Sequence, residues 1–242
     1  MDMGSTLPSE EDVWSLDRLR LPVGSIGDLS ARSRPPRHKP GETFIKGPIS
    51  FPWIQSACRL PGSGLHVAMV YRFLCCRFRP PNRTGLEAVA NGLRISGRTA
   101  RRGLHSAEMA GLLAVEREPG CKLAVSVLDR HGLKTGPELR PLYGPIPWRW
   151  WLSASRLPGM TLHVGAACWL LAGWERSACF ELELDGWTDL GLSRFSASRG
   201  LDNLRHAGLA SIVQTQGRSP GVTIMDMGAE LPESRSGELK KV

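Results

Sequence analysis

The chain has 242 residues, enough for one large or two ordinary domains, and 41% of them are hydrophobic, enough for a sizeable core. No run approaches the roughly 18–20 consecutive apolar residues of a membrane span. The acidic start of the chain, with Glu10, Glu11 and Asp12, does not read as a signal peptide, so we expect a cytoplasmic protein without a membrane partner. The 31 Lys and Arg exceed the 23 Asp and Glu, and the formal charge of +8 favours a polyanionic partner, nucleic acid before membrane surface.

The cysteines, the histidines and the known catalytic motifs give no pattern typical of a metal site or an enzyme. The cysteines form no Cys-x-x-Cys pair and have no histidine at ligand spacing, so we predict reduced thiols and no metal. There is no glycine-rich phosphate loop, no G-x-S-x-G and no H-E-x-x-H. The sequence therefore predicts a protein that is not an enzyme and needs no cofactor. The cysteines concerned are Cys58, Cys75, Cys76, Cys121, Cys168 and Cys179.

Two parts of the chain repeat each other at a constant offset of 97 residues. Residues 47–67 and 144–164 agree at 13 of 21 positions, and residues 93–129 align with 190–226 in the same register without a gap. A register that holds over about 80 residues predicts a tandem duplication of one domain. We expect a disordered arm at 1–43, a first domain at 44–130, a linker at 131–143, a second domain at 144–226 and a disordered tail at 227–242.

The first repeat begins with two predicted helices. Residues 65–78 are almost continuously apolar and too long for a strand, which predicts a largely buried helix after the breaker Pro61-Gly62. Apolar residues at 86, 89, 90 and 93 have helical spacing and predict a second, amphipathic helix.

A third helix and a hairpin complete the first repeat. Ser96 suits an N-cap, and Gly111 suits the C-terminal stop of a helix whose apolar face comprises Ala100, Gly103, Leu104 and Ala107. Two short β-type runs, 113–117 and 123–128, flank a Pro-Gly turn and predict a hairpin.

The second repeat has the same order with one addition. Ser193 is the expected N-cap of a helix ending near Ala207, and strands are expected at 210–214 and 222–225. Residues 180–184 alternate between apolar and acidic, which predicts an extra strand between the first two helices. The first repeat has Arg-Pro-Pro-Asn at 79–82, so there we expect that strand to be shortened or lost.

The order helix, helix, short turn, helix and hairpin is typical of a winged helix-turn-helix. The predicted fold class is therefore mainly α with small β-wings (α+β), as two tandem winged helix-turn-helix domains. The chain resembles bacterial winged-helix DNA-binding proteins, MarR-like and replication-initiator-like domains most. The resemblance covers both repeats and rests on Ser96, Ala100, Arg102, Leu104, Ala110-Gly111-Leu112 and Gly120.

In such a motif the third helix would lie in the major groove of double-stranded DNA, its N-terminal residues near the base edges. Arginine suits this place because its fork bonds guanine O6 and N7. An alternative is that the basic stripe of this helix is simply a solvated face. Against it, no carboxylate balances the stripe before Glu108. We expect base contacts from Arg98 and Arg101, with Thr99 as a further candidate, phosphate contacts from Arg94, Arg102 and Lys122, and His105 on the same face.

The second repeat carries a different set at the matching positions. Phe195, Ser198, Arg199 and Asp202 replace Arg98, Arg101, Arg102 and His105. The DNA-binding candidates of this repeat are Ser198, Arg199, Asn203 and Arg218. The charge is divided in the same way, because residues 44–130 hold 13 basic and 5 acidic side chains whereas residues 141–226 hold 7 of each.

These observations predict a sequence-specific DNA-binding protein, a bacterial transcriptional regulator acting as a built-in pseudo-dimer on an asymmetric site. A plasmid replication initiator is an alternative. In another alternative the second repeat is an interaction or dimerisation module that binds a second copy or another protein. The matched His66 and His163 are expected to be capping or packing residues. Some tryptophans of the second repeat are expected at an interface between the repeats or on a partner surface.

Overall fold

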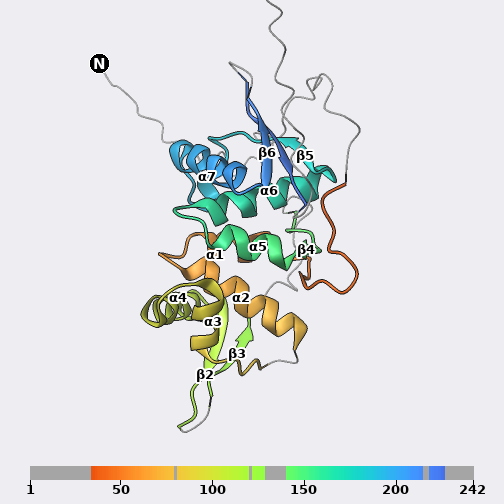
Figure 1. The fold of residues 1–242 in the computed structure, drawn as a ribbon. Helices are drawn as coiled ribbons and strands as arrows, with labels where there is room; N and C mark the ends of the chain where they lie inside the picture. The colour runs from red at the N-terminus through yellow and green to blue at the C-terminus, as the bar shows by residue number, and fades with distance from the viewer. Residues whose placement is uncertain (1–33, 79–80, 120–121, 129–139, 215–217, 227–242) are drawn as a thin grey trace, which may run out of the picture.

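The computed structural model describes residues 34–78, 81–119, 122–128, 140–214 and 218–226. Its fold is α+β, with α-helices and small antiparallel sheets. The elements form two lobes, one for each repeat, which meet at a central interface, the waist, that includes residues 51–58 and 148–155 (Figure 1). Within the described ranges, no helix combines the length and apolar character needed to cross a membrane.

The first lobe contains the predicted helices and hairpin together with a further short helix. Its elements are β1 (Phe44–Ile45), α1 (Phe51–Cys58), α2 (Gly64–Arg77), α3 (Leu86–Leu93), α4 (Gly97–Met109), β2 (Leu113–Glu116) and β3 (Ala124–Val127). The long apolar run forms α2, and the amphipathic pattern forms α3. Pro52 lies in the first turn of α1, where its missing N–H is not needed.

The second lobe repeats this order except at the counterpart of α3, where a 3₁₀ turn replaces the α-helix, so the second helix expected in this repeat is reduced to a turn. Its elements are β4 (Ile146–Pro147), α5 (Trp148–Ser155), α6 (Thr161–Glu175), β5 (Cys179–Glu181), the 3₁₀ turn η3 (Thr188–Leu190), α7 (Arg194–His206), β6 (Ala210–Val213) and β7 (Gly221–Ile224). The predicted extra strand is β5, which pairs with β7. In the first lobe the described part of the matching segment, from residue 81 on, forms a single bridge between Asn82 and Val125 in place of a strand, as the expected shortening predicts.

The two lobes have related cores, and the equivalent residues Arg72 and Trp169 show how their chemistry differs. Trp53 and Trp150 are matching residues and are both buried. The guanidinium of Arg72 lies 4.9 Å from the ring centroid of Trp53, a cation–π contact. Trp169 takes the place of Arg72 in the second lobe and packs edge-on against Trp150, with centroids 5.5 Å apart.

The backbones of the two repeats pair across the waist in a symmetric way. Ile45 pairs with Ile146, and Ile49 pairs with Leu142. With the offset of 97, these are the same pair of positions with the two repeats exchanged. Gly47 and its equivalent Gly144 lie between them, and a Cβ on Gly47 would be 2.4 Å from the Gly144 nitrogen. Only glycine permits this approach.

Side chains at the waist follow the same symmetry. Arg59 donates hydrogen bonds to the backbone oxygen and to Oδ1 of Asp189, at 3.0 and 3.2 Å. Its equivalent Arg156 donates to the backbone oxygen of Gly92, the residue that matches Asp189. The rings of His66 and His163, also equivalent, lie 6.5 Å apart. The repeats are thus related by a pseudo-two-fold axis, as the subunits of a homodimer are.

Residues next to the expected domain boundaries take part in this packing. Leu142, within the expected linker, is fully buried, and Glu42, within the expected arm, lies 3.6 Å from Arg149. The Thr43 carbonyl accepts a hydrogen bond from the Trp148 N–H. The remainder of the arm before residue 34, the linker at 131–139 and the tail from 227 lie outside the described residues.

Candidate nucleic-acid interface

Helix α4 is fixed by its N-cap and by a close approach to α2. The Ser96 Oγ accepts a hydrogen bond from the Thr99 N–H at 3.1 Å, as its sequence position predicts. A Cβ on Gly103 would meet the Ser63 carbonyl oxygen and the Val67 Cγ2, each at 2.9 Å. The helices therefore cross in close contact at this glycine. The opposite face of α4 is turned to solvent.

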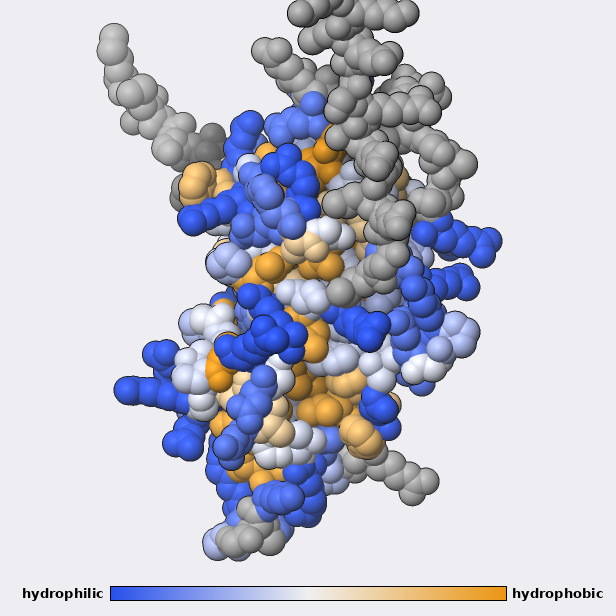
Figure 2. Space-filling view, viewed as in Figure 1, coloured by the Kyte–Doolittle hydropathy of each residue, from blue (hydrophilic) through white to orange (hydrophobic). Residues whose placement is uncertain are grey.

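The solvent face of α4 carries the predicted basic residues. Arg98, Arg101 and Arg102 are exposed, and His105 retains 69% of its side-chain exposure. Across the described ranges, no carboxylate lies within 4.0 Å of these three arginines. In the space-filling view, hydrophilic side chains project outward from α4 (Figure 2).

The acidic residue on α4 is neutralised from the hairpin. Both oxygens of Glu108 accept hydrogen bonds from Arg117, at 2.6 and 2.5 Å. This bidentate contact holds the pKa of Glu108 below its usual value. Arg117 was not among the predicted site residues, because it lies nine positions further along the chain, on the hairpin. The turn at Ala110-Gly111, between α4 and β2, reverses the chain and brings Arg117 back beside the helix.

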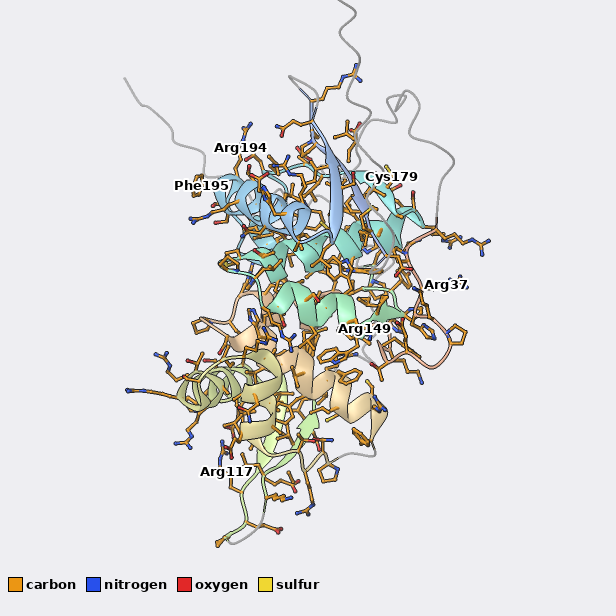
Figure 3. The ribbon with its side chains drawn as sticks, in the orientation of Figure 1. Arg37, Arg117, Arg149, Cys179, Arg194 and Phe195 are labelled. Carbon is orange, nitrogen blue, oxygen red and sulfur yellow. The ribbon has the colours of Figure 1, made fainter. Side chains whose placement is uncertain are left out.

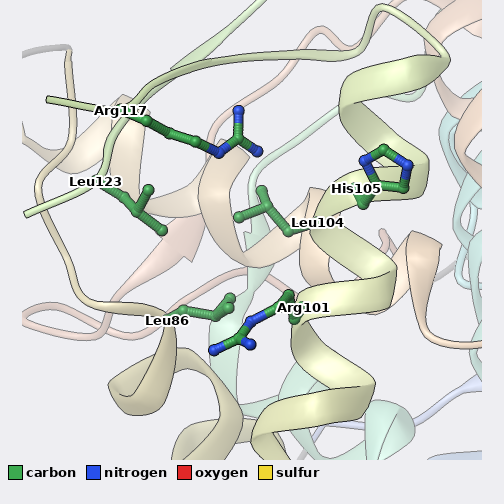
Figure 4. Close-up of a pocket in the computed structure, with 6 residues that line it drawn as sticks. All are labelled: Leu86, Arg101, Leu104, His105, Arg117 and Leu123. Atoms are coloured by element: carbon green, nitrogen blue, oxygen red, sulfur yellow. The ribbon is translucent and has the colours of Figure 1, made fainter. Parts of the chain in front are cut away.

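A shallow groove runs between α4 and the hairpin (Figure 4). Leu86, Leu104 and Leu123 form its apolar part, and Arg101, His105 and Arg117 line it with cationic or titratable groups. The groove places Arg117 of the hairpin beside Arg101 and His105 of the helix, and the charge of Arg117 is balanced there by Glu108.

The other predicted residues of the first repeat differ in whether their side chains are exposed or already hydrogen-bonded within the protein. Arg94 is exposed at the turn between α3 and α4, in the left-handed conformation with φ 56°. The Thr99 hydroxyl lies 2.8 Å from the Ser96 Oγ and so belongs to the helix cap. Lys122 is exposed on the hairpin. Arg94 and Lys122 are thus available to a ligand, whereas Thr99 is engaged within the helix.

Helix α7 of the second lobe is built like α4. Its Ser193 cap accepts from the Ser196 N–H at 3.2 Å, and a Cβ on Gly200 would meet the Val164 Cγ2 at 2.5 Å. Its exposed face is less basic, because Arg194 pairs with Asp185 and Arg205 pairs with Asp202.

The predicted residues of the second repeat are not all free. Ser198, Arg199 and Arg218 are exposed. The Asn203 amide instead donates to the Thr161 Oγ1 at 2.9 Å and the Pro158 carbonyl at 3.3 Å, which ties α7 to the start of α6. Asn203 therefore has a packing contact that its place in the sequence did not reveal. Phe195, which was not among the predicted site residues, is 74% exposed.

The pseudo-two-fold axis places the two helices on a common side of the molecule. In Figure 1, α4 and α7 lie on the same side, above and below α1 and α5, and the hairpins extend toward opposite ends. Phe195 and Arg194 project from the outer side of α7 (Figure 3). A single elongated ligand could therefore contact both helices.

No grouping of three or more His, Cys, Asp or Glu side chains within the described ranges is arranged to hold a metal ion. A scan against protein-family models, a search of curated proteins and a search of solved structures each gave no match to this chain.

Proposed function

We propose that this protein binds double-stranded DNA in a sequence-specific way, as a single-chain counterpart of a dimeric winged helix-turn-helix regulator. The observation that supports it most is the solvent face of α4, where Arg98, Arg101 and Arg102 are exposed and have no carboxylate within 4.0 Å among the described residues. Like charges at helical spacing destabilise an isolated helix, and DNA would remove that cost. In this proposal α4 enters the major groove, and its resemblance to bacterial regulators makes transcriptional control the expected role.

The roles within α4 follow from position. Arg98 and Arg101 lie in the first two turns and would read guanine edges through their guanidinium forks. Arg102 and Arg94, with Lys122 on the hairpin, would bind phosphates and fix the register. The pairing of Glu108 with Arg117 supports this assignment, because it removes the negative charge nearest to the groove.

The second repeat would contact the same duplex through α7. The pseudo-two-fold relation of the lobes is the arrangement by which dimeric helix-turn-helix proteins reach two half-sites about one helical turn apart. The waist also gives the second repeat a partner, namely the first repeat, as Trp148 stacks on Phe73 with ring centroids 4.0 Å apart. The two sets of exposed side chains differ, so the proposed site is asymmetric.

In vitro selection from a random duplex pool with the full chain tests the proposal. We expect one enriched asymmetric sequence, bound by one chain per duplex. The logarithm of the binding constant should fall with the logarithm of salt with a slope steeper than roughly −5, as about six phosphate contacts predict. Replication initiation would instead be indicated if the selected sequence occurs as short repeats beside an origin.

Substitutions separate sequence reading from simple charge. Arg101→Ala should weaken binding to the selected duplex by about 1–3 kcal/mol and relax the preference at one base pair. Arg102→Ala should lower the salt slope by about one without changing the selected sequence. Arg77→Ala, at the far end of α2, is the matched control and should change neither. Equal affinity for selected and unrelated duplexes, unaltered by Arg101→Ala, would contradict the proposal.

A further inference from the structure

Phe195 occupies the position in the second repeat that Arg98 occupies in the first. Both are the second residue of a helix capped by a serine, Ser193 for α7 and Ser96 for α4. Because the pseudo-two-fold axis relates the two helices, a ligand that Arg98 contacts in one half meets Phe195 in the other. The duplication has thus replaced a cation with an aromatic ring at an equivalent outer position.

Phe195 is exposed more fully than a phenylalanine usually is. Phe195 is 74% exposed, and Met109 is equally exposed; no other large hydrophobic residue among those described is more exposed. Phenylalanine is ordinarily a core residue, and burying such a side chain contributes about 1.5–3 kcal/mol. The ring projects from the outer side of α7, away from the body of the lobe (Figure 3).

The surroundings of Phe195 are small and weakly charged. Ser198 and Arg199 follow it at i+3 and i+4 on the same face. The neighbouring Arg194 is held by Asp185 at 3.3 Å. Asp202 completes the face at i+7 and is paired with Arg205 at 3.0 Å. The face therefore offers an apolar ring, a hydroxyl and one arginine without a carboxylate partner within the described ranges. This set suits a surface that presents an apolar group beside phosphates.

In the major groove, one natural base of unmodified DNA presents such an apolar group. Thymine carries a C5 methyl, whereas the major-groove edges of adenine, guanine and cytosine present hydrogen-bonding atoms. We infer that Phe195 is a specificity-determining residue that contacts the C5 methyl of a thymine in the half-site under the second repeat. This inference rests on the proposed function and assigns a guanine-reading half-site to α4 and a thymine-reading half-site to α7.

Removing that methyl group tests the inference directly. The duplex selected by the full chain from unmethylated synthetic DNA is remade with uracil at each thymine in turn. Uracil pairs as thymine does and lacks only the C5 methyl. We expect one substitution, in the half-site distal to the α4 guanines, to weaken wild-type binding about three- to tenfold. Phe195→Ala should weaken binding to the thymine duplex similarly and should not distinguish uracil from thymine.

Two further variants complete the test. Phe195→Arg restores at α7 the residue type of α4 and should shift the preferred base at that position from thymine to guanine in a repeated selection. Met109→Ala removes an equally exposed apolar side chain at the end of α4 and should leave the uracil response unchanged.

The outcomes distinguish the inference from the proposed function. Sequence-specific binding with full uracil sensitivity in Phe195→Ala, or with no uracil sensitivity at any thymine, would overturn the inference alone and would assign the ring to a protein partner. Absence of sequence-specific DNA binding by the wild-type chain would overturn both.

Discussion

The two lobes differ most where they face outward and least where they face each other. On the outer face, α4 has three arginines without a carboxylate partner within the described ranges, whereas α7 has a phenylalanine, a serine and one such arginine. At the waist, equivalent residues such as Gly47 and Gly144 meet across the axis. A residue on the axis contacts its own counterpart and the other waist residues contact the opposite lobe, so a change there disturbs both lobes. An outer residue affects one lobe alone and is free to diverge.

The histidines on the axis allow the largest test of this comparison. Burial lowers the pKa of His66 and of His163 to about 4, although hydrogen bonding to the backbone opposes the shift. In the unfolded chain each histidine has its ordinary pKa of about 6.5, so below that pH the unfolded state binds protons that the folded state does not. The free energy of unfolding is therefore highest above pH 6.5 and falls as the pH drops toward 4. At pH 5 we expect a loss of about 2 kcal/mol for each histidine.

Urea unfolding of the full chain at pH 7 and pH 5 measures this loss. His66→Asn and His163→Asn should each remove about half of the acid sensitivity, because the two residues are equivalent across the axis. His105→Asn, at an exposed position, is the control and should leave the sensitivity intact. Acid sensitivity that is unchanged in both axial variants would show that the waist is not its source.

The second test compares the glycines at which the outer helices cross the inner ones. In the first lobe a Cβ on Gly103 would lie 2.7 Å from the Ser63 Oγ and also 2.9 Å from the Ser63 backbone oxygen, whereas on Gly200 the closest atom is a side-chain methyl of Val164, and the nearest backbone atom is 3.4 Å away. A side chain can yield more easily than backbone. We expect Gly103→Ala to cost about 2–3 kcal/mol and Gly200→Ala about 1 kcal/mol.

Urea unfolding again provides the measurement, with Gly92→Ala as the control. Gly92 lies in α3 with open space around the added methyl, so alanine there should stabilise the chain by about 0.5 kcal/mol. Equal costs at Gly103 and Gly200 would show that α2 moves as readily as the Val164 side chain.

Periodicity and capping predicted the outer elements well. The Ser96 and Ser193 caps, the amphipathic α3 and the strand that survives only in the second lobe are all local patterns. Helices α1 and α5 were not predicted. Both are short, and their buried residues pack within a waist supplied partly by the other repeat, so neither shows a long amphipathic period. The concentration of repeat identity in 47–67 and 144–164 marked this waist, and the symmetric contacts now give its reason.

The candidate site was less predictable than the fold. The exposed arginines of α4 follow from helical spacing alone. Thr99 is bonded within the helix cap, and Asn203 is bonded to Thr161. Both contacts depend on which neighbours the fold places beside these side chains. Arg117 reaches Glu108 only after the hairpin folds back. Such contacts between elements have no period in the sequence.

The smallest test concerns that ion pair, which the second lobe lacks. The positions of Glu108 and Arg117 are occupied there by Arg205 and Gln214. Arg117→Gln introduces into the first lobe the residue of the second. Because Arg117 is 53% exposed, we expect a loss of less than about 1 kcal/mol in the free energy of unfolding, and less still at high salt.

DNA binding should respond to the same pair with opposite signs. Arg117→Gln leaves the Glu108 carboxylate without its cation beside the α4 groove, so affinity for the selected duplex should fall by about threefold, or about 0.6 kcal/mol. Glu108→Gln removes the negative charge and frees Arg117 for a phosphate, so affinity should rise. A fall in both variants would mean that the pair acts by holding the hairpin in place. A fall in Arg117→Gln together with a rise in Glu108→Gln would mean that the pair acts through its charge. In that case the difference in DNA affinity between the two lobes would depend on the hairpin as well as on the helix.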